Sequence, residues 1–302
     1  MSRIVLTGAG GLLGSAFKGA LREFSVTTLG RDHLDADAPG DLSSLIRSAD
    51  PELLINCAAD TDVERAERDA SMNLKVNAQL PAVIAEICKR YDIKLVHFSS
   101  TGCYGNWKST PYVDDDELRP PTAHHRAKAM GEDAVRNSGC RYLILRTGWL
   151  FGGGPEQPKN FVWKRLLESR SSKELFSDAS QRGCPTHVVD LVKQVLLMAR
   201  TGLDGTFNVT SQGSASRYEY VSAIVAASGV PCVVKPGPPF ARLARVSANE
   251  TARNARLQSL GLDCMPGWQD SIRSYVSDLL TSPAWLALDR VRTDHRSECG
   301  EA

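Results

Sequence analysis

The sequence predicts an α/β protein built on a doubly wound parallel sheet, with a smaller mixed α/β lobe in its second half. Short apolar runs alternate with longer helical patterns through the first half of the chain. A glycine-rich turn follows the first apolar run, and Gly/Pro-rich loops interrupt the second half. Strands that alternate with helices form right-handed βαβ units, which assemble into a parallel sheet covered on both faces.

The expected strands of the first half are short, apolar and rich in β-branched residues, as is typical of strands buried on both faces. They lie at residues 3–7, 25–29, 52–56, 94–100 and 141–147. Amphipathic stretches predict helices at residues 12–24, 41–50, 71–91 and about 125–137. A helix therefore follows each of the first four strands, which is the pattern of a doubly wound sheet.

The second half is less regular. A Gly/Pro-rich loop leaves the sheet at 151–160, a strand is expected at 206–209, and helices are expected at about 161–170, 187–200, 217–228, 250–260 and 268–281. We predict a dinucleotide-binding domain at 1–155, to which 176–205 returns, and a substrate-binding lobe formed by 156–175 and 206–281. The polar tail at 282–302 is predicted to be disordered.

The bulk composition argues against several classes of protein. The chain has 302 residues, 42% of them hydrophobic, and a formal net charge of +1, which gives no electrostatic reason to bind nucleic acid. No apolar run is long enough to span a membrane, and the first residues lack a signal-peptide pattern. The eight cysteines are scattered without a C-x-x-C pair, so we expect a cytoplasmic protein with free thiols and no metal site.

The turn LTGAGGLLG (6–14) follows the first strand and opens the first helix, with Gly8, Gly11 and Gly14 in a G-x-x-G-x-x-G pattern. Small residues there let the backbone approach a pyrophosphate, whose charge is then held by N–H groups of the helix N-terminus. Because the turn lies between a strand and a helix, it predicts a Rossmann-type dinucleotide site rather than a tight turn without a ligand. We assign cofactor contacts to Gly8, Gly10, Gly11, Leu12, Leu13 and Gly14.

The tip of the second strand bears on the choice of cofactor. NAD sites usually carry an acid at this point, which holds the ribose 2′-OH. Here Gly30 and Arg31 stand there, which favours a 2′-phosphate and hence NADP(H) over NAD(H); an exposed turn arginine beside Asp32 is the competing interpretation. Asp35 is expected to edge the adenine pocket or to cap the next helix. At the end of the third strand, the residues expected to border the cofactor are Asn56, Ala58 and Ala59.

Two polar groups mark the catalytic end of the sheet. The fourth strand runs into HFSSTGCYG (97–105), and HHRAKAMGE (124–132) sets His124 one helical turn before Lys128. The other stretches that carry a resemblance are LTGAGGLLG, GRDHLD, LINCAADTDVERAE, LILRTGWLFG, QRGCPTHVVDL and GTFNVTSQGSASRYEYV. In this order they resemble the extended short-chain dehydrogenases/reductases, and more narrowly the branch that contains dTDP-4-dehydrorhamnose reductase.

The resemblance implies a role for each polar residue. In the family, a serine or threonine at the fourth strand hydrogen-bonds the substrate carbonyl, and a tyrosine in Y-x-x-x-K transfers the proton. The lysine lowers the pKa of the tyrosine and holds the nicotinamide ribose. Carried over, Ser100 takes the hydroxyl role, with Thr101 as its neighbour and substitute, and Lys128 takes the lysine role. The i, i+4 spacing places positions 124 and 128 on one helix face.

His124 departs from the family pattern, because it stands where the tyrosine is expected. An imidazole has an ordinary pKa near 6.5 and a phenol near 10, and a neighbouring Lys128 ammonium favours the neutral ring. Neutral imidazole keeps one N–H that can hydrogen-bond a carbonyl oxygen, although it is a weak acid. Three interpretations stay open: His124 is the proton donor, Tyr104 supplies the proton, or the protein binds a nucleotide without turnover. His125 and Arg126 are expected on the helix surface.

The resemblance also implies substrate contacts, which we assign to Tyr104, Trp149, Asn160 and Arg245. Aromatic packing between the lobes is the competing interpretation for Trp149. Arg245, together with Asn249, would meet a nucleotide diphosphate, since guanidinium groups suit phosphate oxygens. The arginine-proline motif of the family reads Arg245-Val246 here, which departs from the pattern.

These observations predict an NADP(H)-dependent oxidoreductase that reduces the 4-keto group of a nucleotide-activated deoxysugar. The expected partner is that small-molecule substrate, with no nucleic acid and no membrane, and a homodimer stays open. The alternatives are a catalytically impaired nucleotide-binding or regulatory member of the same family, and a nucleotide-sugar epimerase. Dehydratase chemistry is disfavoured, because the Asp-Glu pair that it needs is replaced by Thr101-Gly102.

Overall fold

The predicted parallel sheet is present in the computed structural model, which describes residues 3–288. Its six strands lie in the order β10-β5-β4-β3-β1-β2, and all neighbours are parallel. The bounds are β1 (Arg3–Thr7), β2 (Ser25–Leu29), β3 (Leu53–Asn56), β4 (Lys94–Ser100), β5 (Tyr142–Thr147) and β10 (Gly205–Asn208). The order places the carboxyl ends of β1, β3 and β4 side by side, so the loops that follow them form one edge.

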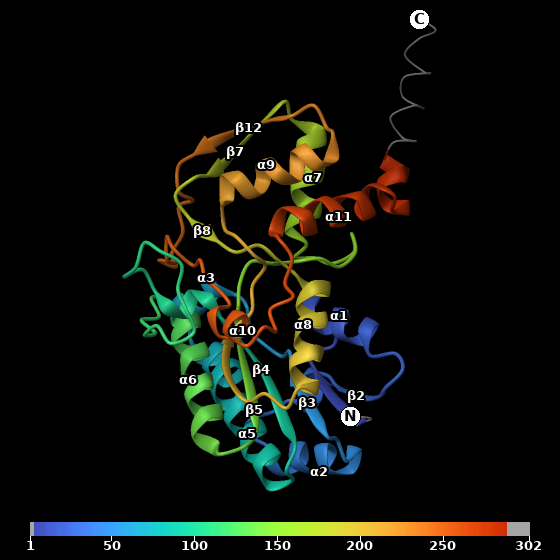
Figure 1. Cartoon of the computed structure of the whole chain (residues 1–302), viewed down its shortest axis with the longest axis vertical. Coiled ribbons are helices and arrows are strands. Elements are labelled where there is room, and N and C mark those ends of the chain that lie inside the picture. Colours follow the sequence, from blue (N-terminus) through green and yellow to red (C-terminus); the bar gives the residue numbers. More distant parts are fainter. Residues whose placement is uncertain (1–2, 289–302) are drawn as a thin grey trace, which may run out of the picture.

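Helices cover both faces of this sheet (Figure 1). On one face α1 (Leu12–Ala20) packs against α8 (Val188–Arg200), over a core that includes Phe17 and Leu191. The other face is covered by α2 (Pro39–Ala49), α5 (Leu80–Arg90) and α6 (Ala123–Ser138). The strands are buried on both sides, which explains why the sequence shows continuous apolar runs rather than alternation.

A smaller lobe lies above the carboxyl ends of the strands in Figure 1. It contains α7 (Phe161–Ser171), α9 (Arg217–Ser228), α11 (Trp268–Leu280) and a parallel pair formed by β7 (Glu174–Asp178) and β12 (Val233–Gly237). A third apolar core fills it, with Tyr220, Trp268 and Tyr275 among its buried residues. The lobe is therefore stabilised by its own core and closes over the loops of the sheet.

Shorter elements connect these parts. Near the site they are α3 (Val63–Arg68), α4 (Ser71–Leu74), the π-helical η2 (Lys75–Gln79) and the 3₁₀ turn η3 (Thr101–Tyr104). The others are η1 (Arg31–His33), β6 (Leu150–Phe151), β8 (Arg182–Gly183), β9 (Thr186–His187), β11 (Ala215–Ser216) and α10 (Ala255–Ser259). The single helix expected at 71–91 is thus divided into α4, η2 and α5.

The structure differs from the predicted division of the chain at three points. Strand β10 pairs with β5 at the edge of the main sheet, although 206–281 was assigned to the lobe. Strand β7 pairs with β12, so residues 176–178 belong to the lobe rather than to the returning segment. The expected disorder from 282 is wrong up to 288, because residues 283–288 are helical and Trp285 is buried against Trp163. Residues 289–302 of that tail lie outside the described residues.

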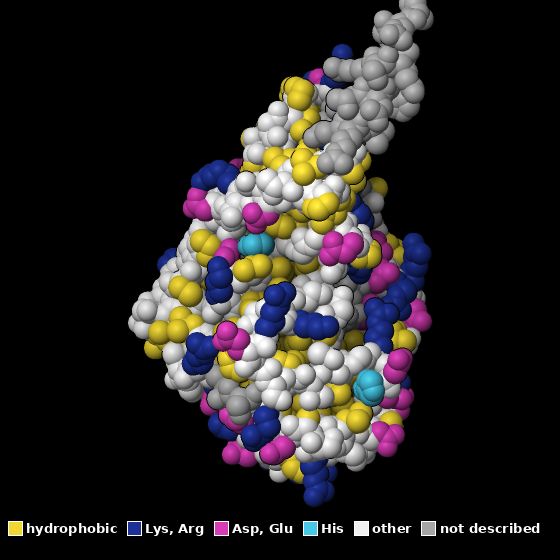
Figure 2. Space-filling model, turned by 90° about the vertical axis from the view of Figure 1, so that its right-hand side faces the viewer, with side chains coloured by type: hydrophobic (Ala, Val, Ile, Leu, Met, Phe, Trp, Pro, Cys, Tyr) yellow, Lys and Arg dark blue, Asp and Glu magenta, His cyan; other side chains and the backbone are white. Residues whose placement is uncertain are grey.

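The surface fits the near-neutral composition. Acidic and basic side chains are interspersed over the lower part of the face in Figure 2, without a field of one sign. No helix within residues 3–288 is long and apolar enough to cross a membrane. The described cysteines are unpaired, and no cluster of His, Cys, Asp and Glu in the described part of the chain could hold a metal ion.

Candidate active site

The glycine-rich turn between β1 and α1 is shaped for close backbone approach. Gly8 has a φ of +66°, and a Cβ on it would lie 2.7 Å from the backbone of Cys57 and Ala58 at the end of β3. A Cβ on Gly14 would lie 2.1 Å from the carbonyl oxygen of Gly8. Gly10 faces open space, and α1 begins without a side-chain cap, so its first N–H groups are left for an anion.

The two leucines of the turn serve the core instead. Leu13 is buried under the sheet, and Leu12 packs against the same cluster. The structure therefore brings the four glycines together at the strand end. Leu12 and Leu13 could contact a cofactor only through their main-chain atoms.

The tip of β2 carries an exposed arginine. Arg31 opens η1, and its side chain has no hydrogen bond or ion pair with any other residue of the described chain. Four residues on, the Asp35 carboxylate lies 2.8 Å from Lys75 Nζ, and the Asp37 carboxylate lies 2.7 Å from the same atom. The hydrogen bond from Lys75 lowers the pKa of Asp35, and the ammonium offsets part of the negative charge of the two carboxylates, which would repel a 2′-phosphate.

The end of β3 is tied to its neighbours. Asn56 is buried, accepts a hydrogen bond from Thr7 Oγ1 at 2.7 Å, and lies 3.2 Å from His97 Nδ1. The structure places it inside the sheet rather than at the open edge. Ala58 and Ala59 follow where the chain leaves the sheet, and Ala59 is exposed.

The two hydroxyls at the end of β4 differ in what they are free to do. Ser100 caps η3, because its Oγ accepts a hydrogen bond from Gly102 N at 3.1 Å; its O–H is left to donate. Thr101 is 1% exposed, and its Oγ1 has no hydrogen-bond partner among residues 3–288. The Thr101 hydroxyl is closed off from solvent, so the half-buried Ser100, whose O–H is free, is the hydroxyl open to a ligand.

Helix α6 presents His124 and Lys128 from consecutive turns. Thr122 caps the helix by accepting a hydrogen bond from His125 N, which fixes where the first turn begins. Both His124 and Lys128 are buried, at 7% and 6% exposure. The pair expected from the sequence therefore faces the sheet and the site rather than solvent.

His124 lies in a polar but desolvated setting. Its Nδ1 lies 3.3 Å from Asn73 Nδ2, and Asn73 is in turn bound to the Asp60 carboxylate at 3.0 Å. Burial and the Lys128 ammonium lower the pKa of His124 to about 4, against the opposing effect of Asp60. The ring is therefore neutral at pH 7.

Lys128 is held by the neighbouring strand, since its Nζ donates to the Phe98 carbonyl at 2.8 Å. Burial lowers the pKa of Lys128 to about 8, although Cys103 and Glu132 oppose the shift. At pH 7 it remains a cation beside His124. An ammonium here can hold a hydroxyl of a bound ribose while it keeps the imidazole neutral.

The Gly131-Glu132 step of α6 has a structural explanation. A Cβ on Gly131 would lie 2.2 Å from the Asn77 carbonyl oxygen, so glycine allows α6 to approach η2. Glu132 is fully buried and pairs with Arg146 of β5 at 2.7 Å. The helix that carries His124 is thus anchored to both the π-helical segment and the sheet.

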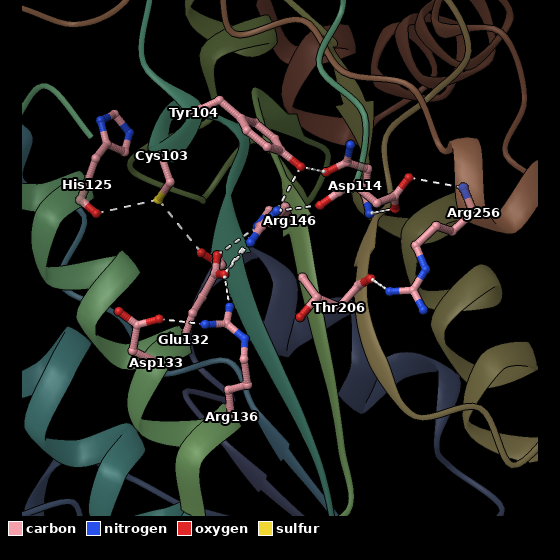
Figure 3. A network of polar contacts seen from close by, with 12 residues as sticks. Cys103, Tyr104, Asp114, His125, Glu132, Asp133, Arg136, Arg146, Thr206 and Arg256 are labelled. Atoms are coloured by element: carbon pink, nitrogen blue, oxygen red, sulfur yellow. Dashed lines mark hydrogen bonds and ion pairs between the residues drawn. The ribbon is translucent and has the colours of Figure 1, made fainter. Parts of the chain in front are cut away.

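Tyr104 belongs to this buried network rather than to an open substrate cleft. Its hydroxyl donates to Asn208 Oδ1 at 2.7 Å and accepts from Arg146 at 2.9 Å (Figure 3). Burial raises the pKa of Tyr104, and the residue is 0% exposed. The hydroxyl is fully occupied, so this placement does not favour Tyr104 as a proton donor or substrate contact.

His125 is buried, so the expectation of a surface residue is wrong. Its Nδ1 lies 2.9 Å from Thr122 Oγ1, and a Cβ on Gly102 would lie 2.2 Å from its Nε2. The Gly102 of SSTGCYG therefore makes room for the His125 ring. The sequence motifs alone do not predict this contact, because Gly102 and His125 come together only in the folded chain.

The wall of the smaller lobe is built around Trp149. Its φ is +48°, which is uncommon for a residue with a side chain, and its Nε1 donates to Glu250 at 2.9 Å. The guanidinium of Arg217 stacks 3.5 Å from the ring centroid. Sequence reasoning missed Arg217 and Glu250, since nothing in their local sequence marks them. The left-handed backbone and the stacking together hold Trp149 in one orientation.

The other two predicted substrate residues differ in exposure. Asn160 is buried, caps α7 and donates to Tyr275 Oη at 2.7 Å. Arg245 is exposed and makes no hydrogen bond or ion pair within residues 3–288. Asn249 Nδ2 donates a hydrogen bond to the main-chain carbonyl of Lys108 at 2.7 Å. Of this set, Arg245 is the side chain free to take an anion.

Two contacts connect the lobe to the loops of the sheet. Lys159 Nζ donates to Thr61 Oγ1 at 2.7 Å. Glu64 of α3 accepts from Arg242 Nε at 2.9 Å and from the main-chain N–H of Leu243 at 2.9 Å. These contacts hold the lobe against the segment that follows β3 and carries Asp60, Thr61 and Glu64.

The glycine-rich turn after β1 and the buried polar pair of α6 beside β4 lie at the edge of the sheet where oxidoreductases of the Rossmann type bind a dinucleotide. Residues 2–281 match the family described as the RmlD substrate binding domain, and the chain belongs to this family.

Relatives of the chain are named for reduction of nucleotide sugars. The dTDP-4-dehydrorhamnose reductase of Mycobacterium tuberculosis is 32% identical over 93% of each chain. The dTDP-4-keto-6-deoxy-D-glucose reductase of Streptomyces niveus is 32% identical over 72% of this chain and 75% of its own. The crystal structure of the Bacillus anthracis dTDP-4-dehydrorhamnose reductase in complex with NADP superposes with a TM-score of 0.87, at 25% identity, over 92% of this chain and all of that chain.

Proposed function

We propose that this protein is an NADP(H)-dependent reductase of the 4-keto group of a dTDP-activated deoxysugar. The family, the names of the relatives and the NADP in the Bacillus anthracis structure support this function. The exposed Arg31 and the Asp35 already paired with Lys75 support NADP(H) over NAD(H). The sugar nucleotide is the partner, and we place the reaction in the cytoplasm.

The chain supplies two groups to the carbonyl. The O–H of Ser100, with Thr101 as its neighbour, donates to the carbonyl oxygen, and His124 approaches the same oxygen with its ring N–H. Lys128 holds the ribose of the dinucleotide. When bound, NADPH supplies the hydride for the carbonyl carbon, and the residues of the chain orient the substrate and stabilise the developing negative charge.

The observation that carries the proposal is the buried His124/Lys128 pair of α6, whose Lys128 Nζ donates to the Phe98 carbonyl on β4, two residues before Ser100. The test measures NADPH oxidation with a dTDP-4-keto-6-deoxysugar for the wild type, His124→Tyr, His124→Ala and Lys128→Ala. We expect turnover by the wild type and a loss of about a hundredfold or more in kcat for the alanine variants.

The variants also separate this function from nucleotide binding without turnover. A gain of activity in His124→Tyr over an inactive wild type would mean an impaired reductase. NADPH binding without oxidation in any variant, against a panel of such sugars, would overturn the reductase function.

A further inference from the structure

The inner ring nitrogen of His124 faces the amide of a residue outside the catalytic motifs. Asn73 lies on α4 and is fully buried, and its Nδ2 is 3.3 Å from His124 Nδ1. A nitrogen that faces an N–H donor can only accept, so the orientation of this amide decides where the neutral ring carries its proton. Because the O and N atoms of an amide are hard to distinguish, the orientation has to follow from its neighbours.

Main-chain atoms of Asp60 determine the orientation of both amides in this cluster. Asp60 N donates to Asn77 Oδ1 at 3.2 Å, and the Asp60 carbonyl accepts from Asn77 Nδ2 at 2.8 Å. Asn77 Nδ2 also donates to Asn73 Oδ1 at 3.0 Å. Turning either amide over would set donor against donor and oxygen against oxygen. The Asn73 oxygen therefore faces Asn77, and its nitrogen faces the Asp60 carboxylate and His124.

The other tautomer of His124 would have to share an acceptor that is already in use. The main chain of Asp60 hydrogen-bonds the ring in the direction that raises the pKa of His124. Its carbonyl already accepts from Asn77 Nδ2 at 2.8 Å, and Asn73 Nδ2 lies 3.2 Å from it. A proton on Nδ1 would also point at the N–H of Asn73. Both contacts disfavour that tautomer.

We propose that Asn73 is a positioning residue that fixes the neutral ring of His124 in the tautomer with its proton on Nε2. The Asn73 amide occupies Nδ1 and leaves Nε2–H as the ring's one hydrogen-bond donor. The charged and titratable groups around the ring are Lys128 and His125 on α6, Asp60 after β3, Lys159 before α7 and Glu67 on α3.

This tautomer has a consequence for catalysis, which rests on the proposed function. As hydride adds to the carbonyl carbon, the electron pair of the C=O bond moves to the oxygen. The oxygen takes the Nε2 proton of His124, and the ring regains a proton from water. The Asn73 N–H stabilises the electron-rich ring in between, because it donates to Nδ1.

The tautomer can be measured without any turnover. Protein labelled with ¹⁵N-histidine is examined at pH 7 by long-range ¹H–¹⁵N correlation, and His124→Ala identifies the signals of this ring. We expect a protonated Nε2 in the wild type and a protonated Nδ1 in Asn73→Asp, because the new carboxylate accepts rather than donates. Asn137→Asp, an exposed change on α6, is expected to leave the tautomer unchanged.

A protonated Nδ1 in the wild type would overturn the proposal, and so would an unchanged tautomer in Asn73→Asp. If Asn73→Asp does not fold, Asn73→Ala replaces it and is expected to give a mixture of both tautomers; a pure Nε2–H form would contradict the role of Asn73.

Kinetics give the second readout. Asn73→Asp is expected to lower kcat about a hundredfold at pH 7 without raising the KM for NADPH, and to recover activity as the pH falls, because imidazolium carries both protons. Equal losses at all pH values would indicate a merely structural role. If the wild type shows the Nε2–H tautomer but does not oxidise NADPH with the sugar, the proposed function fails while the positioning role stands.

Discussion

At the scale of single residues, the protein combines groups whose charge states are set by burial. His124 is neutral and Lys128 is charged at pH 7, since desolvation and mutual repulsion lower the pKa of His124 to about 4 and burial lowers that of Lys128 to about 8. A neutral imidazole beside an ammonium can act as a hydrogen-bond donor to a carbonyl. The pair is therefore suited to stabilise the developing oxyanion by a hydrogen bond from Nε2–H, along which the proton then moves to the oxygen.

This assignment predicts the pH dependence of kcat/KM. We expect a plateau between the two pKa values and a decline above about 8, where Lys128 loses its proton and its hold on the ribose. A steady fall of about tenfold per pH unit from about 4 upwards would show that imidazolium is the required acid.

The buried histidines also predict how stability depends on pH. Burial lowers the pKa of His97, His124 and His125, so the unfolded chain binds more protons than the folded one between about 4 and 6.5. The free energy of unfolding should therefore fall as the pH drops below about 6.5. Urea unfolding across this range measures it. His125→Gln should make the dependence shallower, while the exposed His33→Gln should leave it unchanged.

At the scale of elements, the position of α6 is fixed by a cap at its first turn and by contacts on two sides. Thr122 caps its start, Glu132 pairs with Arg146 of β5, and Gly131 lets it touch η2. The HHRAKAMGE stretch indicated a helix with His124 and Lys128 on one face. It did not reveal that Asn73 meets His124, because α4 and α6 lie far apart in the sequence.

The close approach of α6 to η2 can be tested with a single methyl group. Gly131→Ala places a Cβ 2.2 Å from the Asn77 carbonyl oxygen, so we expect a loss of about 1–3 kcal/mol in the free energy of unfolding and lower kcat. Gly19→Ala on α1 meets nothing within 4 Å and should stabilise the fold by about 0.5–1 kcal/mol. A neutral effect of Gly131→Ala on urea unfolding would contradict the packing argument.

At the scale of the whole molecule, the two lobes meet over the site. The main sheet was predictable, since each early strand is a continuous apolar run and the turn at Gly8–Gly14 has a clear local signature. The boundaries of the lobe were harder to predict, because β10 is a short strand that joins the main sheet through its pairing with β5. The role of Tyr104 could not be predicted either. It lies near Ser100 in the sequence, but its hydroxyl is hydrogen-bonded to Asn208 and Arg146.

The contact between the lobes predicts a selective effect on the sugar substrate. Glu64→Ala removes the acceptor for Arg242 and for the Leu243 N–H, so we expect a higher KM for the sugar nucleotide and little change in that for NADPH. Glu174→Ala removes an ion pair within the lobe, with Lys235, and is the matched control. Steady-state kinetics with each substrate varied separately measures both. Equal changes in the two KM values would contradict the closing role of Glu64.

Hydride transfer to the sugar carbonyl can be followed with an isotope. The protein is incubated with NADPH deuterated at the transferable C4 position and a dTDP-4-keto-6-deoxysugar, and the product is analysed by mass spectrometry and NMR. We expect a product that carries deuterium at C4 of the sugar, formed about a hundredfold more slowly with Lys128→Ala. An unlabelled product, or an unreduced sugar in the presence of bound NADPH, would contradict it.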